Sequence, residues 1–216
     1  MAAKPKKVKT RDRILQVALQ LFNEEGEAQV STVDIAGVLD ISPGNLYYHF
    51  KGKEAIIEAL FDDFEEEIRQ VLNAPINRPL AIDDNWIFVY IVFEEINDFR
   101  FFYAAMSSIL ERCPDLRGRF SRLLAMKTNT ADAVLKSLED EGMLDFSPKE
   151  REALASRLAA HMTFWLQFAA FQAPEKAGRR LINDGVHSLM MQIAPYVQGD
   201  RAAYIALLEE YFRKQR

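Results

Sequence analysis

The segment from Thr32 to Glu54 constrains the fold of this chain more than any other. Its pattern predicts two short helices joined by a tight turn. We expect Thr32 to be the N-cap of the first helix, because its hydroxyl can accept a hydrogen bond from a free backbone N–H group. The buried face of this helix is predicted to contain Val33, Ile35, Ala36 and Leu39.

The second helix of this segment has a sharply defined start. Asp40–Ser42 forms the turn, and Ser42 is the expected N-cap. Pro43 takes the first helical position, where its fixed φ suits the helix and its missing N–H group costs nothing. Leu46 and Phe50, four residues apart, are expected to face inward. The residues left outside are Gly44, Asn45, Tyr47, Tyr48 and His49.

The outer face of the second helix has unusual chemistry. A solvent-exposed helix without a binding function usually carries Lys and Glu, whereas this face offers an amide, two phenols and an imidazole. Such groups suit base edges, thymine methyl groups and phosphate oxygens. Gly44 also allows the free N–H groups of the helix N-terminus to come close to a phosphate. The alternative is an ordinary corner between two helices with a solvated face; the residue types favour DNA recognition.

The order of helix, turn and L-Y-Y-H-F-K-x-K-E resembles the DNA-binding domain of the TetR family of bacterial transcriptional regulators, over about residues 10 to 55. The resemblance implies base-edge contacts from Pro43, Gly44, Asn45 and Tyr48. It implies phosphate contacts from Thr32, Tyr47, His49 and Lys53. The chain departs from the family pattern at Asp40, where glycine is usual. Because Asp tolerates left-handed backbone better than most residues, we expect the turn to survive.

Charge is distributed unevenly along the chain. Residues 1–13 carry six basic side chains and one acid, a net charge of +5, so the formal charge of −5 leaves −10 for the remainder. A basic arm before an acidic body is expected when one end of a protein touches nucleic acid. The arm is predicted to lie along phosphates or enter a minor groove. The alternative for Lys4 to Lys7 is a disordered, solubilising tail.

Composition indicates a globular protein of the cytoplasm. A chain of 216 residues with 49% hydrophobic and 27% charged residues fits one or two globular domains and excludes disordered and fibrous classes. No N-terminal apolar run resembles a signal peptide, and the longest apolar stretch, Trp86 to Phe93, is too short to span a bilayer. Cys113, the single cysteine, has no internal disulfide partner and is expected to be a small buried hydrophobe rather than a redox sensor.

Helical periodicity continues on both sides of the DNA-binding motif. A helix over residues 10–25 is predicted to end at Gly26, and a longer one to run from Lys53 to about Leu72. Pro75 and Pro79 mark the clearest break. We place the functional boundary near Glu54, which gives a DNA-binding domain over 1–54 and a ligand-binding and dimerisation domain over 55–216.

The second domain is predicted to be helical, so the fold class is all-α. The composition of residues 86–93 would also suit a buried strand, but no partner strand is found elsewhere. The expected helices cover residues 80–97, 99–112, 115–141, 148–172, 178–197 and 200–215.

A homodimer is expected through the helices near 148–172 and 178–197. The stretch from Leu158 to Phe171 is apolar on nearly every side and therefore needs cover from two directions. One side, with Leu158, Met162, Trp165 and Ala169, is expected to face the core. The other carries Phe164, Phe168 and Phe171. The helix around Ile182, Val186, Leu189, Met190 and Ile193 is expected to pair with it. The resemblance implies a four-helix dimer interface here, and two recognition helices one DNA turn apart would match a pseudo-palindromic operator.

An excess of aromatic residues in the second domain suggests a pocket for a small apolar or aromatic effector. Most of these residues are expected to build the core. Tyr90, Tyr103 and Trp165 are the best pocket candidates, because each has a polar tip that needs a partner when buried. Glu94, Glu95 and Arg100 are possible polar anchors, although a solvated face is the simpler interpretation.

No pattern in the sequence predicts an enzyme. The three histidines, His49, His161 and His187, lack metal-ligand spacing, and no P-loop, GxGxxG or GxSxG motif is present. We expect no cofactor and no metal, and His161 is expected to be a hydrogen-bonded core or interface residue. The sequence therefore predicts a DNA-binding regulator, a repressor released by its effector. The alternative is a helical ligand-binding or interaction protein that does not bind an operator.

Overall fold

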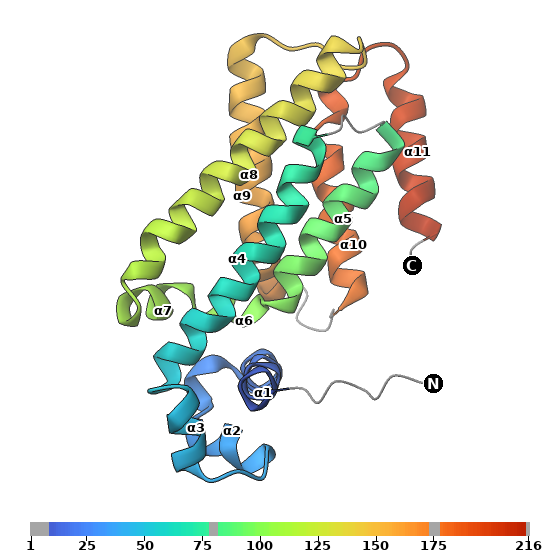
Figure 1. Ribbon diagram of the computed structural model, residues 1–216. Coiled ribbons are helices and arrows are strands. Elements are labelled where there is room, and N and C mark those ends of the chain that lie inside the picture. The colour runs from blue at the N-terminus through green and yellow to red at the C-terminus, as the bar shows by residue number, and fades with distance from the viewer. Residues whose placement is uncertain (1–8, 78–81, 173–177, 215–216) are drawn as a thin grey trace, which may run out of the picture.

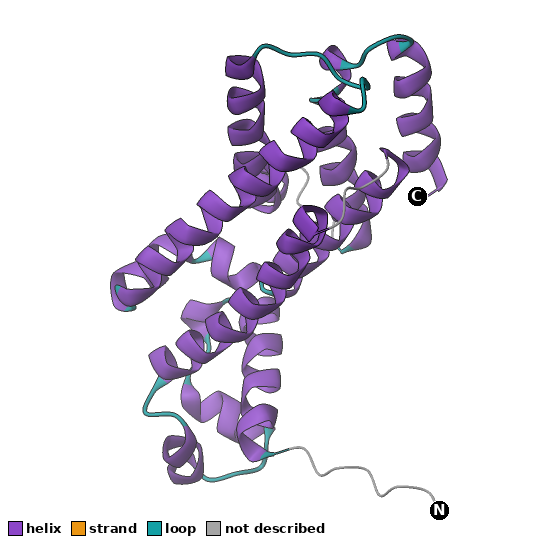
Figure 2. Ribbon diagram, turned by 45° about the horizontal axis from the view of Figure 1, so that its top comes forward, coloured by secondary structure: helices purple, strands orange, loops and turns teal. Residues whose placement is uncertain are grey.

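The computed structural model describes residues 9–77, 82–172 and 178–214, and its regular elements in these ranges are helices, as predicted. Figure 1 shows three short helices at one end of the molecule and a larger helical bundle at the other, and Figure 2 shows the same elements as helices and loops without strands. We call α1–α3 the head and α5–α11 the body. The head contains α1 (Thr10–Glu25), η1 (Glu27–Gln29), α2 (Thr32–Val38) and α3 (Pro43–His49).

Helix α4 (Lys53–Asn77) leads from the head into the body (Figure 1). The body elements are α5 (Ile82–Asp98), α6 (Arg100–Ala104), α7 (Met106–Arg112), α8 (Asp115–Asp140), α9 (Pro148–Gln172), α10 (Arg179–Met191), η2 (Ala194–Tyr196) and α11 (Arg201–Lys214). Among the described helices, none combines the length and the apolar composition that a bilayer span requires.

The start of α2 corrects two predictions. Ser31 is the N-cap: its hydroxyl accepts the Asp34 N–H at 3.3 Å, and the Asp34 carboxylate accepts the Ser31 N–H at 2.8 Å. Thr32 is already the first helical residue, so it does not hold the cap position. Val33 is 59% exposed rather than buried, because it lies two residues before Ile35 and therefore on the opposite side of the helix.

The turn and the start of α3 agree with the sequence. Asp40 has a φ of +53°, the left-handed conformation that the turn requires. Ser42 caps α3 by accepting the Asn45 N–H at 3.1 Å, and Pro43 is the first helical residue. Leu46 and Phe50 are buried. The motif is therefore held by local capping and by two inward side chains.

Helix α4 continues about one turn beyond its predicted end near Leu72, through Pro75 to Asn77. Pro75 cannot donate to the carbonyl of Val71, four residues earlier. The next carbonyl, that of Leu72, accepts the hydroxyl of Thr130 at 3.0 Å, and Leu72 itself is fully buried. This part of α4 is thus packed against α8. Pro79 lies outside the described residues.

Two predicted body helices are divided. Residues 99–112 form α6 and α7, which meet at Ala105 with ψ of 17°. The predicted helix over 178–197 ends at Met191, and Pro195 lies in the short turn η2 that follows. Residues 86–93 are helical within α5, so the strand alternative is excluded.

The core runs continuously from the head into the body. The predicted stripe of α4 is buried along its length; it contains Ile56, Ile57, Leu60, Phe61, Phe64, Ile68 and Leu72. Phe61 packs against Phe102 of α6 with ring centroids 4.8 Å apart, and Phe64 packs against Phe99 at 5.2 Å. Phe22 of α1 contacts Phe101 at 5.2 Å. These ring contacts join α1, α4 and α6.

Candidate nucleic-acid interface and ligand cavities

The outer face of α3 carries exposed aromatic side chains with polar tips. Tyr47 is 57% and Tyr48 77% exposed, and Asn45 is exposed one turn earlier. The Lys51 ammonium lies 4.5 Å from the centroid of the Tyr47 ring. Helix α3 contains no acidic residue. The face therefore combines hydrogen-bonding groups and aromatic surface with a neighbouring positive charge, a combination that suits a polyanion.

Gly44 has no internal reason to be glycine. A side chain at this position would meet only the Ser42 hydroxyl, at 3.9 Å, and the backbone does not adopt positive φ. The lack of a side chain at Gly44 matters instead for the outer surface, because no side chain projects from the first turn of α3 at this position. A second backbone can then approach the N-terminal N–H groups of the helix.

The remaining predicted contact residues lie around the same surface. Pro43 is exposed in the first turn of α3, and His49 is partly exposed in its last turn. Thr32 is partly exposed at the first position of α2. Arg11, at the start of α1, is exposed and has its guanidinium carbon 5.1 Å from the centroid of the Phe50 ring. The basic arm before Lys9 lies outside the described residues.

Lys53 differs from the other predicted phosphate contacts, because it is bound within the protein. Its ammonium lies 3.0 Å from the Glu27 carboxylate and donates to the carbonyls of Glu27 and Val30 at 2.9 and 3.0 Å. The side chain is only 20% exposed. Sequence spacing gave no sign of this, since Glu27 precedes it by 26 residues. A phosphate contact by Lys53 would require it to leave these partners, so we assign it a structural role in the head.

Glu27 and Asn23 connect the head to the body. The buried Glu27 carboxylate accepts Arg112 of α7 at 2.7 Å, and Arg112 also pairs with Glu54 at 3.0 Å. Asn23 donates its side-chain amide to the Asp98 carbonyl at 2.7 Å and accepts the Phe101 N–H at 3.0 Å. These polar contacts hold α1 and η1 against α5–α7.

The three predicted pocket residues are not brought together in one site. Tyr90 is half-buried. Burial is the main cause that raises the pKa of Tyr90, and the neighbouring Glu94 carboxylate raises it further. Tyr103 is fully buried and accepts a hydrogen bond from Lys127 at 3.1 Å. Trp165 donates to the Leu181 carbonyl at 2.9 Å and lines a shallow hollow between α9, α10 and α11. Only Tyr103 lines the larger cavity described below.

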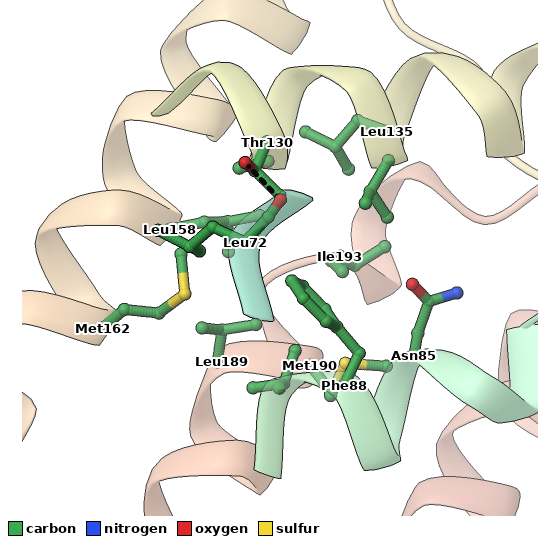
Figure 3. Close-up of a pocket in the computed structure, with 13 residues that line it drawn as sticks. Leu72, Asn85, Phe88, Thr130, Leu135, Leu158, Met162, Leu189, Met190 and Ile193 are labelled. Atoms are coloured by element: carbon green, nitrogen blue, oxygen red, sulfur yellow. Dashed lines mark hydrogen bonds between the residues drawn. The ribbon is translucent and has the colours of Figure 1, made fainter. Parts of the chain in front are cut away.

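Two cavities in the body have contrasting sizes. The bundle cavity, about 40 Å³, lies among α4, α5, α8, α9 and α10 (Figure 3). It is lined mainly by apolar side chains such as Leu72, Phe88 and Met162. The junction cavity, about 580 Å³, lies between the head and the body. Sites for small molecules typically measure about 300–1,000 Å³, so the junction cavity has the suitable volume.

The junction cavity is lined by both parts of the molecule. The head contributes Phe22, Asn23 and η1, and the body contributes residues of α6 and α9. Arg100 lines it, and among the described residues its guanidinium donates to the carbonyls of Asn97 and Asn23, at 3.2 and 3.1 Å. Among the possible anchors that the sequence suggested, Arg100 is thus the one that reaches a cavity of suitable size.

Sequence reasoning missed Lys127, a fully buried lysine of α8. Its exposure is 1%, and its neighbours on the same stripe of the helix are apolar core residues such as Leu123 and Leu135. A lysine in a stripe of this kind is a signal visible in the sequence, because ionised side chains are rarely buried without a partner.

His161 and Cys113 agree with their predicted roles. His161 contacts the Gly185 carbonyl at 3.2 Å and the Gln192 amide at 3.1 Å, and burial lowers its pKa. Cys113 is buried and not bonded in a disulfide. Within the described ranges, no group of three His, Cys, Asp or Glu side chains is placed to hold a metal ion.

Comparison with known proteins gives matches over both parts of the chain. The regulator UidR of Escherichia coli K12 is 40% identical over 67 residues, which are 31% of this chain and 34% of UidR. The matches with UidR and with a Bacillus subtilis regulator each span only about a third of the relative's length.

Solved structures extend the similarity to the whole fold. A TetR-family regulator from Marinobacter aquaeolei has a TM-score of 0.85 and 29% identity, covering 97% of this chain and 100% of that one. The structure of SmeT with triclosan has a TM-score of 0.60 and 21% identity, covering 89% and 93% of the two chains.

Family descriptions account for most of the chain. Residues 14–60 match "Bacterial regulatory proteins, tetR family", and residues 63–205 match "Bacterial transcriptional repressor". Together with the fold and the exposed face of α3, these matches identify the chain as a member of the TetR family of bacterial transcriptional regulators.

Proposed function

We propose that the protein is a dimeric DNA-binding repressor that leaves its operator when a small molecule binds the body. The observation that carries this proposal is the outer face of α3. Its residues Asn45, Tyr47 and Tyr48 are exposed, and the helix begins at a tightly capped N-terminus. In a helix-turn-helix protein, the second helix of the motif enters the major groove and its first residues contact base edges.

The contacts divide into two kinds. We assign base-edge contacts to Pro43, Gly44, Asn45 and Tyr48, in the turns of α3 that would enter the groove. We assign phosphate contacts to Thr32, Tyr47 and His49 at the edges of this surface. Lys53 is left out of the set, because its ammonium is bound to Glu27. The basic arm would add sequence-independent attraction.

A dimer is supported by the exposed apolar stripe of α9. Phe164, Phe168 and Phe171 are 46%, 56% and 91% exposed, whereas Leu158, Met162 and Ala169 of the same helix are buried. Such a stripe is an aggregation liability unless another surface covers it. A second copy of α9 would cover it and place two α3 helices on successive turns of DNA, about 34 Å apart.

The part predicted for α10 in this dimer needs revision. Its apolar residues Ile182, Val186 and Leu189 are buried within their own chain, where they pack in the core. They are therefore not available to a partner. The α10 residues that remain partly exposed, such as Leu181 and Ser188, would instead flank the α9 stripe.

Ligand control is supported by the contacts between the head and the body. Effector binding must favour one arrangement of the two heads, and by linkage it then lowers operator affinity as much as the operator lowers effector affinity. Helix α4 and the contacts of Asn23 and Glu27 provide the mechanical connection. We place the functional boundary near Glu54, with a DNA-binding domain over 1–54 and a ligand-binding and dimerisation domain over 55–216.

No catalytic role is proposed. Regulators of this family act by binding, and His161 has structural partners rather than an arrangement with a nucleophile. The body is proposed to bind a small apolar or aromatic effector, as the SmeT fold does with triclosan.

Genomic footprinting with the purified full-length protein tests the proposal. We expect protection of a pseudo-palindromic site, including one upstream of its own gene, and a mobility shift of that DNA. A protein that binds a ligand but protects no DNA would instead be a helical binding protein without operator recognition, and the proposal would fail.

A further inference from the structure

We propose that the effector is a small amphipathic acid, whose carboxylate pairs with Lys127 while its apolar part occupies the junction cavity. This inference rests on the proposal that the body binds an effector. It adds the chemical class of that effector and the residue that selects it. Tyr103 connects Lys127 with the junction cavity, because its hydroxyl is hydrogen-bonded to the Lys127 ammonium and the residue lines the cavity.

Lys127 lacks a counter-ion among the described residues. Its ammonium donates to the Tyr103 hydroxyl at 3.1 Å and the Thr163 hydroxyl at 3.3 Å, and both are neutral acceptors. Thr163 already donates its own proton to the Ala159 carbonyl at 2.8 Å. Two acceptors leave one of the three ammonium N–H groups without a hydrogen-bond acceptor in the part of the chain that the structure describes. A charged lysine buried in this way is costly, and a core of this kind would usually hold an apolar residue instead.

The protonation states of the two groups follow from their burial. Burial lowers the pKa of Lys127 to about 7, and the ammonium has no ion-pair partner among the described residues. Tyr103 is the titratable group in contact with it, and burial raises the pKa of Tyr103 far above its usual range. Tyr103 therefore stays a neutral phenol and does not compensate the charge. A carboxylate beside Lys127 would supply the missing negative charge and restore the protonated form.

The position of Lys127 connects it with the junction cavity. Tyr103, Leu166 and Gln167 form part of the cavity wall, and the Lys127 partner Thr163 lies one turn before Gln167 on α9. Tyr103 separates the ammonium from the cavity, so a rotation of its side chain would open the path between them.

Arg100 is a second cation at this cavity, and its hydrogen-bond partners among the described residues are backbone carbonyls rather than carboxylates. Of the two acids that also line the cavity, Glu27 is paired with Lys53 and Arg112, and Glu25 is exposed to solvent. Arg100 in the cavity wall and Lys127, which contacts Tyr103 of that wall, thus have no carboxylate partner among the described residues. An anionic head group is the ligand chemistry that fits both cations.

Binding in this cavity would also explain how the signal reaches the head. The apolar part of the ligand would contact Phe22 of α1 as well as Leu166 of α9. Rotation of Tyr103 would disturb α6, whose neighbouring ring Phe101 packs against Phe22 at 5.2 Å. A single ligand would thus touch both sides of the contact that orients the head.

Calorimetry on the full-length protein without DNA tests the inference. The probes are straight-chain carboxylates from hexanoate to dodecanoate, with the corresponding alcohols as neutral controls. We expect at least one acid to bind about tenfold or more tightly than its alcohol, because a hydrogen-bonded charge pair is lost with the alcohol. At pH 8, comparison of phosphate and Tris buffers should show uptake of about one proton per acid bound, because a largely neutral Lys127 becomes protonated.

Variants identify the group responsible. Lys127→Met should weaken binding of the acid by about tenfold or more, abolish proton uptake and leave binding of the alcohol unchanged. Tyr103→Phe should retain proton uptake, because the amine remains. Lys136→Met is the matched control on the same helix, since its side chain is 46% exposed and pairs with Asp140, and it should bind the acid like the wild type.

Three outcomes would overturn the inference: no acid of the series binds, acids and alcohols bind alike, or wild-type protein binds the acid without taking up a proton. The proton count is measured on the wild type, so it does not depend on the folding of a variant. Because no DNA is present, failure of operator recognition would leave this result unaffected, and the two proposals can fail separately.

Discussion

The chain exposes two aromatic surfaces that differ in chemistry. On α3, Tyr47 and Tyr48 carry hydroxyl groups, and Lys51 lies beside them. On α9, Phe164 and Phe168 have no polar atom in their side chains. A polar-tipped surface next to a cation can exchange its water for phosphates and base edges. A purely hydrocarbon surface gains only when water is excluded, as it is between two protein subunits.

Exposure alone therefore does not define a binding surface. Tyr48 at 77% and Phe171 at 91% exposure are both unusual for large aromatic residues, but they call for different partners. Substitutions that change one surface at a time can separate their functions.

The largest effect is expected for Phe168→Glu. If α9 pairs with a second copy, this change buries an unpaired charge and should weaken dimerisation by about 3 kcal/mol or more, over 100-fold in the dimer dissociation constant. Sedimentation velocity measures it. Ile87→Glu is the control, because Ile87 is a similarly exposed apolar residue, at 59%, on a different helix, α5. An intact dimer of Phe168→Glu would place the interface elsewhere.

A smaller loss, of about 1–3 kcal/mol in the free energy of unfolding, is expected for Lys53→Met, because Glu27 loses a charged partner while it stays buried. Urea denaturation measures this loss. Lys51→Met, an exposed lysine two residues earlier, should change stability by less than about 0.5 kcal/mol.

The salt dependence of DNA binding distinguishes the two possible roles of Lys53. We expect Lys53→Met to leave the slope of log K against log[salt] unchanged. A slope shallower by about one unit per subunit, with normal stability, would restore the phosphate contact that the sequence suggested.

Asn45→Ala and Tyr48→Ala are each expected to lower operator affinity by about 1–3 kcal/mol and to leave binding to random duplex DNA nearly unchanged, because base-edge contacts carry sequence information. Titration of operator and random duplexes at the same salt concentration measures the difference. Equal losses on both duplexes would show that α3 supplies attraction without discrimination.

The smallest effect on stability is expected at the start of α2. Ser31→Ala should cost about 1 kcal/mol, because the helix loses its N-cap. Thr32→Ala, one residue later, should leave the unfolding free energy nearly unchanged but weaken operator binding if its hydroxyl contacts a phosphate. Thermal denaturation and a DNA titration of both variants provide the check, and a stability loss at Thr32 instead of Ser31 would contradict the observed cap.

Much of the head was predictable because its determinants lie close together in the sequence. Ser42 and Pro43 define the start of α3, and Asp40 takes the left-handed backbone that the turn requires. The errors were also local: the cap of α2 lies at Ser31, and Val33 faces outward. The cap error came from placing the start of α2 one residue too late, whereas Val33 lies two residues before Ile35 and therefore on the opposite side of the helix.

Candidate ligand residues were harder to predict. Tyr90, Tyr103 and Trp165 share a large ring and a polar tip, but they line different parts of the body. Composition shows which side chains need a hydrogen-bond partner when they are buried, whereas the identity of that partner depends on which helices pack together. Tyr103 is hydrogen-bonded to Lys127, 24 residues away, and Trp165 donates to the Leu181 carbonyl.

Periodicity and capping act over one or two turns, so the helical fold, the helix-turn-helix motif and the apolar stripe of α9 can be derived from the amino-acid sequence alone. Three further features depend on how the helices pack: Lys53 is bound to Glu27, Lys127 is buried without a counter-ion among the described residues, and a cavity of about 580 Å³ lies between the head and the body. These features arise from contacts between helices far apart in the chain. No local pattern specifies which buried charge will meet a charged partner in the folded protein.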